Sequence, residues 1–462
     1  MDLFRTKAIG TDVHGETGLL RTLGAGDLVL LGIGAIIGAG VFVLTGVAAA
    51  TQAGPALVLS FVLAGFACVF AGLCYAELAA AVGGCGSAYG YAYAALGEIV
   101  AWIIGWALVL EYGMAVSAVA VGWSGYFNNA LTAAGIELPA ALLSAPGADT
   151  GGIVNLPAML IILLLGVLLA FGVKHSARFN AAVVFIKLMA IAIFIVIAVG
   201  NVDTDNWTPF MPFGWQGIVD GAALIFFAYI GFDAVSTAAE ETKQPQRNMP
   251  IGIIGSLAIC TLIYMVVAGL LTGVAPYSTL NNPSPVSAAL LSLGHRWGAA
   301  VVAAGAIAGL TTVMLVMYYG LSRVLFAMSR DALLPERFAA VHPRTRSPVF
   351  VIAIIGIVAS CAAGFTPIGA IAQLVNIGTL FAFVIVCVGV LVLRRTRPDL
   401  HRPFRVPFSP VFPLLGVAAC VYLMLNLDLA TWQYFAIWMA LGLVIYGGYS
   451  VRNSRLAVGT AE

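Results

Sequence analysis

Long apolar runs, separated by short polar connections, dominate the chain between residues 27 and 450. Twelve of these runs can each supply the ~20 apolar residues that a helix needs to cross a bilayer. The pattern therefore predicts an all-α membrane protein with twelve transmembrane helices. The predicted spans are 27–50, 55–81, 97–127, 153–173, 179–200, 217–239, 251–275, 298–327, 349–364, 368–393, 411–427 and 432–450.

The composition excludes a soluble globular chain. Hydrophobic residues make up 61% of the sequence and charged residues only 9%, and the mean hydropathy is +1.03. Such a chain needs a lipid bilayer as its partner. A formal net charge of +1 gives no basic field for nucleic acid, so no nucleic-acid partner is expected.

Lysine and arginine are placed on one side of the predicted membrane. With the N-terminus inside, 19 of the 21 basic residues lie at the inner side, while Lys187 lies within a span and Arg296 lies outside. This asymmetry predicts a multi-pass protein of the cell (inner or plasma) membrane with cytoplasmic termini, residues 1–26 and 451–462. The sequence leaves the oligomeric state open, a monomer included.

Two of the spans are interrupted by glycine at mid-depth: LGIGAIIGAGVFVLTG, residues 31–46, and FFAYIGFDAVSTAAEE, residues 226–241. Unwound backbone is tolerated in a membrane only where protein or a water-filled cavity satisfies its polar groups. A matched pair of such spans is the best sequence indication of a transporter's substrate site.

The interrupted spans are the first and the sixth, so they open successive halves of five spans with opposite topology. This predicts a 5+5 inverted repeat with discontinuous helices 1 and 6. Residues 27–200 form the first repeat and residues 217–393 the second, followed by two C-terminal helices at 411–450. All of residues 27–450 form one transporter domain, because each half needs the other to enclose a site.

Several stretches together resemble the amino acid–polyamine–organocation superfamily of permeases, in particular bacterial relatives of the cationic amino acid transporters. The matching stretches are GIGAIIGAGVFVLTG, CYAELA, GGCGSAYGYAYAALGE, LEYGM, FFAYIGFDAVSTAAEETKQPQRNMPIGI and YGLSRVLFAMSRDALLP, in the family's order, between residues 32 and about 335. The resemblance implies a LeuT-like fold and alternating-access amino acid uptake, by proton coupling or exchange.

The first interruption predicts a carboxylate site. Backbone N–H groups at the start of the outer half-helix and its positive dipole end suit an anion, and Gly38 and Gly40 allow the chain to unwind. Close helix packing is the alternative, since Gly34 and Gly38 form a GxxxG pair. The candidate residues are Ile36, Ile37, Gly38, Ala39, Gly40 and Val41.

The second interruption predicts an ammonium site. Freed carbonyls there can accept hydrogen bonds, so that backbone holds both charged ends of an amino acid. Asp233, just beyond the break, is expected to stabilise the unwound segment. The resemblance assigns Phe227 the role of an aromatic gate. The candidate residues are Phe227, Ala228, Tyr229, Ile230 and Gly231.

Two charged residues lie within spans. Lys187 is about eight residues into the fifth span, too deep for full escape to the interface, and burial favours the neutral form of a lysine. The resemblance places such a lysine where sodium-driven relatives hold an ion, which implies proton coupling. Glu111 in the third span can accept a proton, contact a cationic substrate, or pair with Lys187 or backbone groups.

Met317 in the eighth span is apolar and would ordinarily be core. The resemblance implies that it faces the substrate side chain and favours small neutral L-amino acids such as alanine. Glu111 keeps open the alternative of arginine or lysine uptake, and amino acid or polyamine exchange is a further alternative.

An enzyme is not expected, because all five histidines lie in termini or loops and no metal-ligand spacing occurs. No cofactor is expected, with the proton gradient as driving force.

Two further expectations concern the inner side. Residues 82–98 are rich in Gly, Ala and Tyr, and their tyrosines are expected along the cytoplasmic membrane interface. Glu77, near the inner end of the second span, is expected to make a structural or gating contact.

Overall fold

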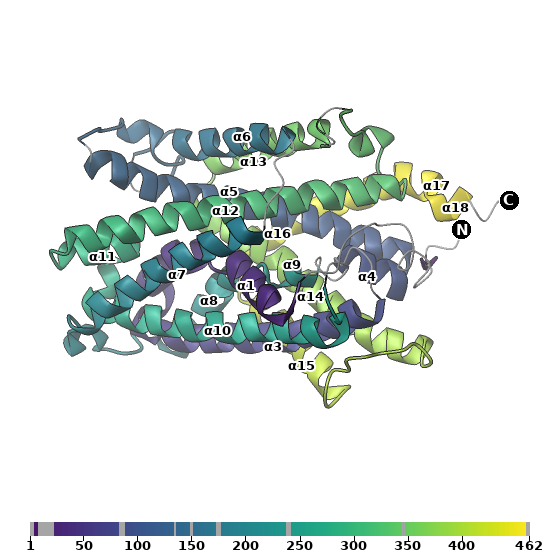
Figure 1. The fold of residues 1–462 in the computed structure, drawn as a ribbon, viewed down its shortest axis with the longest axis horizontal. Coiled ribbons are helices and arrows are strands. Elements are labelled where there is room, and N and C mark those ends of the chain that lie inside the picture. Colours follow the sequence, from purple (N-terminus) through teal and green to yellow (C-terminus); the bar gives the residue numbers. More distant parts are fainter. Residues whose placement is uncertain are drawn as a thin grey trace.

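A computed structural model describes residues 4–7, 23–82, 88–133, 135–147, 151–171, 177–236, 242–343, 345 and 347–458. These residues form helices and connections, with two isolated β-bridges and no named strand among them. The long helices lie side by side along one axis of the molecule, and α17 and α18 lie at the same end as α4 (Figure 1). The all-helical fold is as predicted.

The α-helices follow the predicted spans closely. Their bounds are α1 (Ala25–Ile36), α2 (Thr45–Ala48), α3 (Leu57–Val82), α4 (Ala88–Ala95), α5 (Glu98–Ala133), α6 (Leu156–Ala170), α7 (Ala177–Val199), α8 (Gly214–Ile225), α9 (Phe232–Ser236), α10 (Pro245–Val274), α11 (Pro285–Ser292), α12 (Arg296–Arg330), α13 (Val349–Phe365), α14 (Ile368–Thr396), α15 (Val411–Leu425), α16 (Leu429–Ile445), α17 (Val451–Asn453) and α18 (Arg455–Val458).

Each of the twelve predicted spans overlaps helix in the structure. Seven helical stretches of the described residues are long and apolar enough to cross a bilayer, and four shorter apolar helices accompany them. The predicted end of the sixth span, residue 239, lies outside the described residues, as do most of residues 1–26 and the end of the tail at 459–462.

Proline marks the start of several helices. It is the first residue of α10 and α11 and directly precedes α13, α14 and α15. Its ring fixes φ near the helical value, and its missing N–H would lack a partner in the first turn of a helix in any case. These prolines therefore separate neighbouring apolar runs into individual helices.

Helix α5 lies at the centre of the bundle, packed against α12 and α14, while α10 packs on α3 and on α1. One continuous apolar core runs through these helices. Large exposed apolar side chains remain on α6, α7, α13, α15 and α16. A lipid-facing surface explains that exposure better than water does.

The tyrosines of α4 do not lie exposed at an interface, contrary to the expectation from sequence. Tyr89, Tyr91 and Tyr93 are buried. The Tyr89 hydroxyl donates to Asp331 at 2.8 Å, and burial, with the nearby Asp331 carboxylate, raises the pKa of Tyr89. The Tyr89 hydroxyl therefore keeps its proton. Asp331 accepts from Tyr89 and Glu98 from Tyr93, which replaces the partners that water would supply at an interface.

Residues near both ends of the chain make contacts at the same end of the bundle. Lys7 forms an ion pair with Asp331 at 3.1 Å, and the backbone N–H of Arg455 donates to the Asp331 carbonyl. Glu98 accepts hydrogen bonds from Tyr446 and Ser454 near the C-terminus. These contacts fasten α4, α5 and α12 together at this end.

Glu77 makes the structural contact expected of it. Its carboxylate, 2% exposed, accepts from Arg394 Nε at 2.9 Å and Arg394 Nη2 at 2.5 Å. It also accepts from the Val406 backbone N–H at 2.6 Å. The pair joins the ends of α3 and α14 and holds the connection to α15.

Candidate functional site

The first predicted break is present. Helix α1 ends at Ile36, Ile37 is extended (φ −72°, ψ 102°), and helix resumes as η1 (Gly40–Leu44), which continues into α2 and η2 (Ala49–Ala53). A Cβ at Gly40 would overlap the Cα of Ala228, and a Cβ at Gly38 would lie 3.3 Å from the Val313 side chain. Gly40 thus permits the closest approach of the two broken helices.

The second predicted break is present as well. Helix α8 ends at Ile225, a 3₁₀ turn η6 (Phe226–Tyr229) follows, and Ile230 is extended (φ −62°, ψ 134°). Gly231 has φ +118°, a conformation that glycine adopts without strain, and a Cβ there would lie 2.8 Å from the Ala35 carbonyl. Asp233 accepts the Gly231 N–H at 3.2 Å, so it supports the unwound segment as expected.

Side chains from other helices hold carbonyls at the breaks. Lys187 Nζ donates to Gly34 O at 2.6 Å and to Ile37 O at 2.9 Å. The Tyr264 hydroxyl lies 2.9 Å from both Ile36 O and Ala228 O, which places one donor between the two broken helices. Asn376 on α14 binds carbonyls at the end of α8. Sequence reasoning found Lys187 and missed Tyr264 and Asn376.

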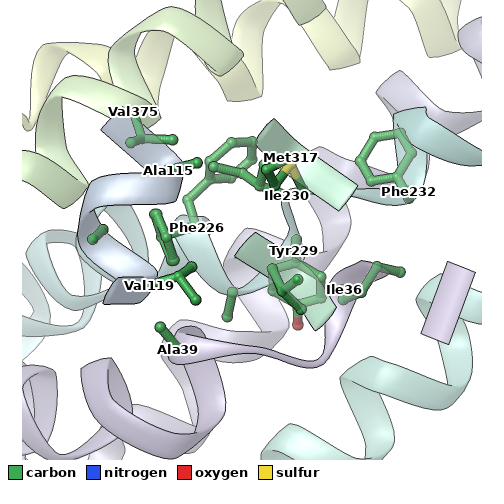
Figure 2. Close-up of a cluster of buried hydrophobic side chains, with 14 of the residues drawn as sticks. Ile36, Ala39, Ala115, Val119, Phe226, Tyr229, Ile230, Phe232, Met317 and Val375 are labelled. Carbon is green, nitrogen blue, oxygen red and sulfur yellow. The ribbon is translucent and has the colours of Figure 1, made fainter. Parts of the chain in front are cut away.

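A cavity lies where the two breaks meet. Every residue that lines it is buried, and none has a polar side chain. Figure 2 shows much of this apolar surround, with Ile36, Ala39, Ala115, Val119, Ile230 and Met317 labelled. The lining residues are Ala35, Ile36, Gly38, Ala39, Gly40, Ala115, Val119, Phe227, Ile230, Val313 and Met317.

Seven of the predicted site residues line this cavity: Ile36, Gly38, Ala39, Gly40, Phe227, Ile230 and Met317. Five more of them, Ile37, Val41, Ala228, Tyr229 and Gly231, lie in the same two segments but are not part of the lining. Four lining residues were not predicted: Ala35, Ala115, Val119 and Val313. Val313 precedes Met317 by four residues, and Ala115 and Val119 follow Glu111 by four and eight, but small apolar residues at helical spacing are equally typical of an ordinary core.

Glu111 is buried but does not line the cavity. It lies one turn of α5 away from Ala115, beside the Thr379 hydroxyl, and its Oε2 has no hydrogen-bond partner in the described part of the chain. No ion pair joins it to Lys187 among the described residues. The pairing of Glu111 with Lys187, one of the alternatives from sequence, is therefore not observed.

The backbone of the two breaks has the chemistry to bind the charged ends of a zwitterion. The first N–H groups of a helix have no partner within that helix, which makes the start of η1 a candidate for the carboxylate. The carbonyls of the second break can accept from an ammonium group. Apolar side chains then surround the remaining substituent. The described residues contain no cluster of three side chains that could hold a metal ion.

A bundle of apolar helices that encloses such a cavity between two broken helices defines a membrane transporter. The family model for amino acid permeases matches residues 23–447, and the chain belongs to this family.

Relatives with known names agree with this assignment. The chain is 50% identical to the methylthioribose transporter of Bacillus subtilis over 98% of this chain and 99% of the relative. It is also 50% identical to the branched-chain amino acid permease BcaP of the same organism, again over 98% and 99%. The vacuolar cationic amino acid transporter 4 of Arabidopsis thaliana is 41% identical over 83% of this chain and 65% of the relative. These relatives are permeases and transporters, not enzymes.

Proposed function

We propose that the protein is a proton-coupled symporter of neutral L-amino acids with apolar side chains, from alanine to the branched-chain amino acids. The observation that carries the proposal is the buried cavity, which combines polar backbone from two broken helices with apolar side chains alone. Such a site recognises the charged ends of any amino acid and disfavours a charged side chain, which would be buried without a partner.

The chain organisation belongs to the same proposal. Residues 27–200 and 217–393 form two inverted repeats of five helices, residues 411–450 add two helices, and both termini face the cytoplasm. The pair of breaks in the first and sixth spans supports this arrangement. The site residues within it are those of the two breaks, with Phe227 as gate and Met317 facing the substrate side chain.

Lys187 supports proton coupling. It is fully buried and binds two carbonyls beside the first break, so its protonation state is linked to the position of α1. The ammonium supplies the charge that a sodium ion would otherwise supply there. Loss of its proton toward the cytoplasm would weaken both bonds and release the inner half-helix.

The names of the relatives suggest other substrates. A cationic amino acid would need an anionic partner, and Glu111 is absent from the lining. Methylthioribose has several hydroxyl groups and no charged ends, so it would need polar side chains, which the lining also lacks. Exchange without a proton would leave Lys187 without a titrating role.

Uptake into proteoliposomes tests these substrates. Radiolabelled leucine and alanine are offered with and without a pH gradient in sodium-free buffer, and all twenty amino acids and methylthioribose are added as competitors. We expect accumulation driven by the pH gradient and competition by neutral aliphatic amino acids. Competition by arginine or methylthioribose alone, or a requirement for sodium, would contradict the proposal.

A further inference from the structure

Besides the Tyr264 hydroxyl, which lies between the two broken helices, each broken helix has a side-chain donor of its own. Lys187 on α7 holds carbonyls of the first break. On α14, Asn376 Nδ2 donates to Ala223 O at 2.7 Å and to Leu224 O at 2.9 Å. Both donors are fully buried. They lie in the fifth and the tenth predicted spans, which are corresponding spans of the two halves.

The carbonyls that Asn376 binds lie in the last turn of α8, directly before η6. Carbonyls in the last turn of a helix have no partner within that helix, and a buried carbonyl left unpaired destabilises the fold. Asn376 therefore helps to set where α8 ends and where the chain that carries Phe227 and Ile230 toward the cavity begins.

Only the nitrogen of the Asn376 side-chain amide forms hydrogen bonds among the described residues. Its Oδ1 has no hydrogen-bond partner among the described residues, so the two bonds from Nδ2 orient the amide. A carboxamide has no ionisable proton at physiological pH, unlike an ammonium group. The bonds from Asn376 thus do not depend on the proton gradient, whereas those from Lys187 do.

We propose that Asn376 is a positioning residue for substrate binding, which holds the second broken helix with a fixed cap while Lys187 provides a titratable cap on the first. This inference rests on the proposed function. It implies that proton release frees the inner part of the first broken helix, whereas the end of α8 stays attached to α14 throughout the transport cycle.

Replacement of the amide by an apolar group of similar size tests this role. Asn376→Leu keeps the volume and introduces no titrating group. We expect the Kd for radiolabelled leucine, measured on purified protein in detergent, to rise about 10- to 100-fold, because one or two buried hydrogen bonds are lost. The pH profile of the remaining uptake keeps its midpoint, because Lys187 is intact. Asn376→Thr retains one donor and gives a smaller rise.

Asn155→Leu provides a matched control. Asn155 is equally buried and caps α6 through the Ala158 N–H at 3.2 Å, away from the cavity lining. We expect its variant to lose thermal stability with an unchanged Kd.

The outcomes separate this inference from the proposed function. A folded Asn376→Leu or Asn376→Thr protein that binds leucine within twofold of the parent overturns the positioning role. A shift of the pH midpoint in Asn376→Leu overturns the division between fixed and titratable caps. A parent protein that binds no amino acid contradicts the proposed function instead.

Discussion

The two glycines of the first break, Gly38 and Gly40, have different neighbours in the structure. Gly40 is pressed against the backbone of Ala228, whereas Gly38 faces the end of the Val313 side chain. Both glycines allow unwinding, but a side chain at Gly40 would displace the main chain of Ala228, so a substitution there disturbs the fold as well as the proposed carboxylate site.

A pair of alanine substitutions measures this difference. We expect Gly40→Ala to lower the stability by about 1–3 kcal/mol through overpacking against a rigid neighbour. Gly38→Ala costs less, since the Val313 methyl groups can move, but it narrows the cavity and weakens binding. Thermal unfolding in detergent and leucine binding provide the two readouts. Restored leucine binding in Gly38→Ala/Val313→Ala would support the contact between Gly38 and Val313. Equal destabilisation by Gly38→Ala and Gly40→Ala would contradict the difference between the two glycines.

Met317 offers the clearest test of substrate size. Its side chain lines the cavity, and serine would remove most of that volume and add a hydroxyl. We expect Met317→Ser to let longer or cationic amino acids compete with labelled alanine, in an uptake assay against all twenty. Val324→Ser, a change on the same helix outside the lining, serves as control. Unchanged competition by arginine and lysine in Met317→Ser would show that Met317 is an ordinary core residue and does not limit the substrate.

At the scale of elements, an ion pair joins two helices whose apolar surfaces alone do not fix how they align along their length. Glu77 and Arg394 tie α3 to α14, and Glu77 also accepts the Val406 N–H. Arg402 Nε lies 3.6 Å from the same carboxylate. Removal of Arg394 therefore leaves the buried Glu77 with the longer Arg402 contact and the Val406 N–H alone. The clamp ties the ends of these two helices together.

We expect Arg394→Ala to lower the stability of the protein. Breaking a buried pair from one side costs about 3–5 kcal/mol, and the partial exposure of Arg394 places the expected loss toward the lower end. The double variant Glu77→Leu/Arg394→Leu removes the buried carboxylate. Arg402, the other basic neighbour of Glu77, keeps its hydrogen bonds to four backbone carbonyls, so this variant should be more stable than Arg394→Ala. Melting temperatures in detergent compare the two. If the double variant melts at a lower temperature than Arg394→Ala, the ion pair itself stabilises the fold by more than the Glu77 carboxylate destabilises it once Arg394 is lost.

How much of this the sequence could predict depends on how distinctive each residue is. The breaks were predictable because glycines at mid-depth of an apolar span are unusual, and Lys187 because a charge there is costly. The cavity positions of Ala115, Val119 and Val313 were not predictable, since a small apolar residue gives the same sequence pattern whether it lines a cavity, packs in a core or faces lipid. Asn376 and Tyr264 carry polar groups within spans, but their partners lie 36 to 228 residues away.

At the scale of the whole molecule, the proposed mechanism holds the first broken helix in one state and releases it in another. Lys187 bridges α7 to the first break, the Tyr264 hydroxyl binds Ile36 O and Ala228 O, and Lys7 forms an ion pair with Asp331 at the end of α12. Of the two lysines, Lys187 is the one beside the cavity, which makes it the better candidate for coupling to the proton.

The Lys187→Ala variant is the decisive test of this coupling. With the ammonium gone, Gly34 O and Ile37 O lose their donor in every state, so the proton gradient no longer changes the position of α1. We expect accumulation driven by a pH gradient to be lost, while counterflow exchange of leucine between the two sides persists. Lys7→Ala, which removes the ion pair with Asp331, should change the rate of uptake but keep its pH dependence. Full accumulation by Lys187→Ala would show that this lysine is not the coupling group.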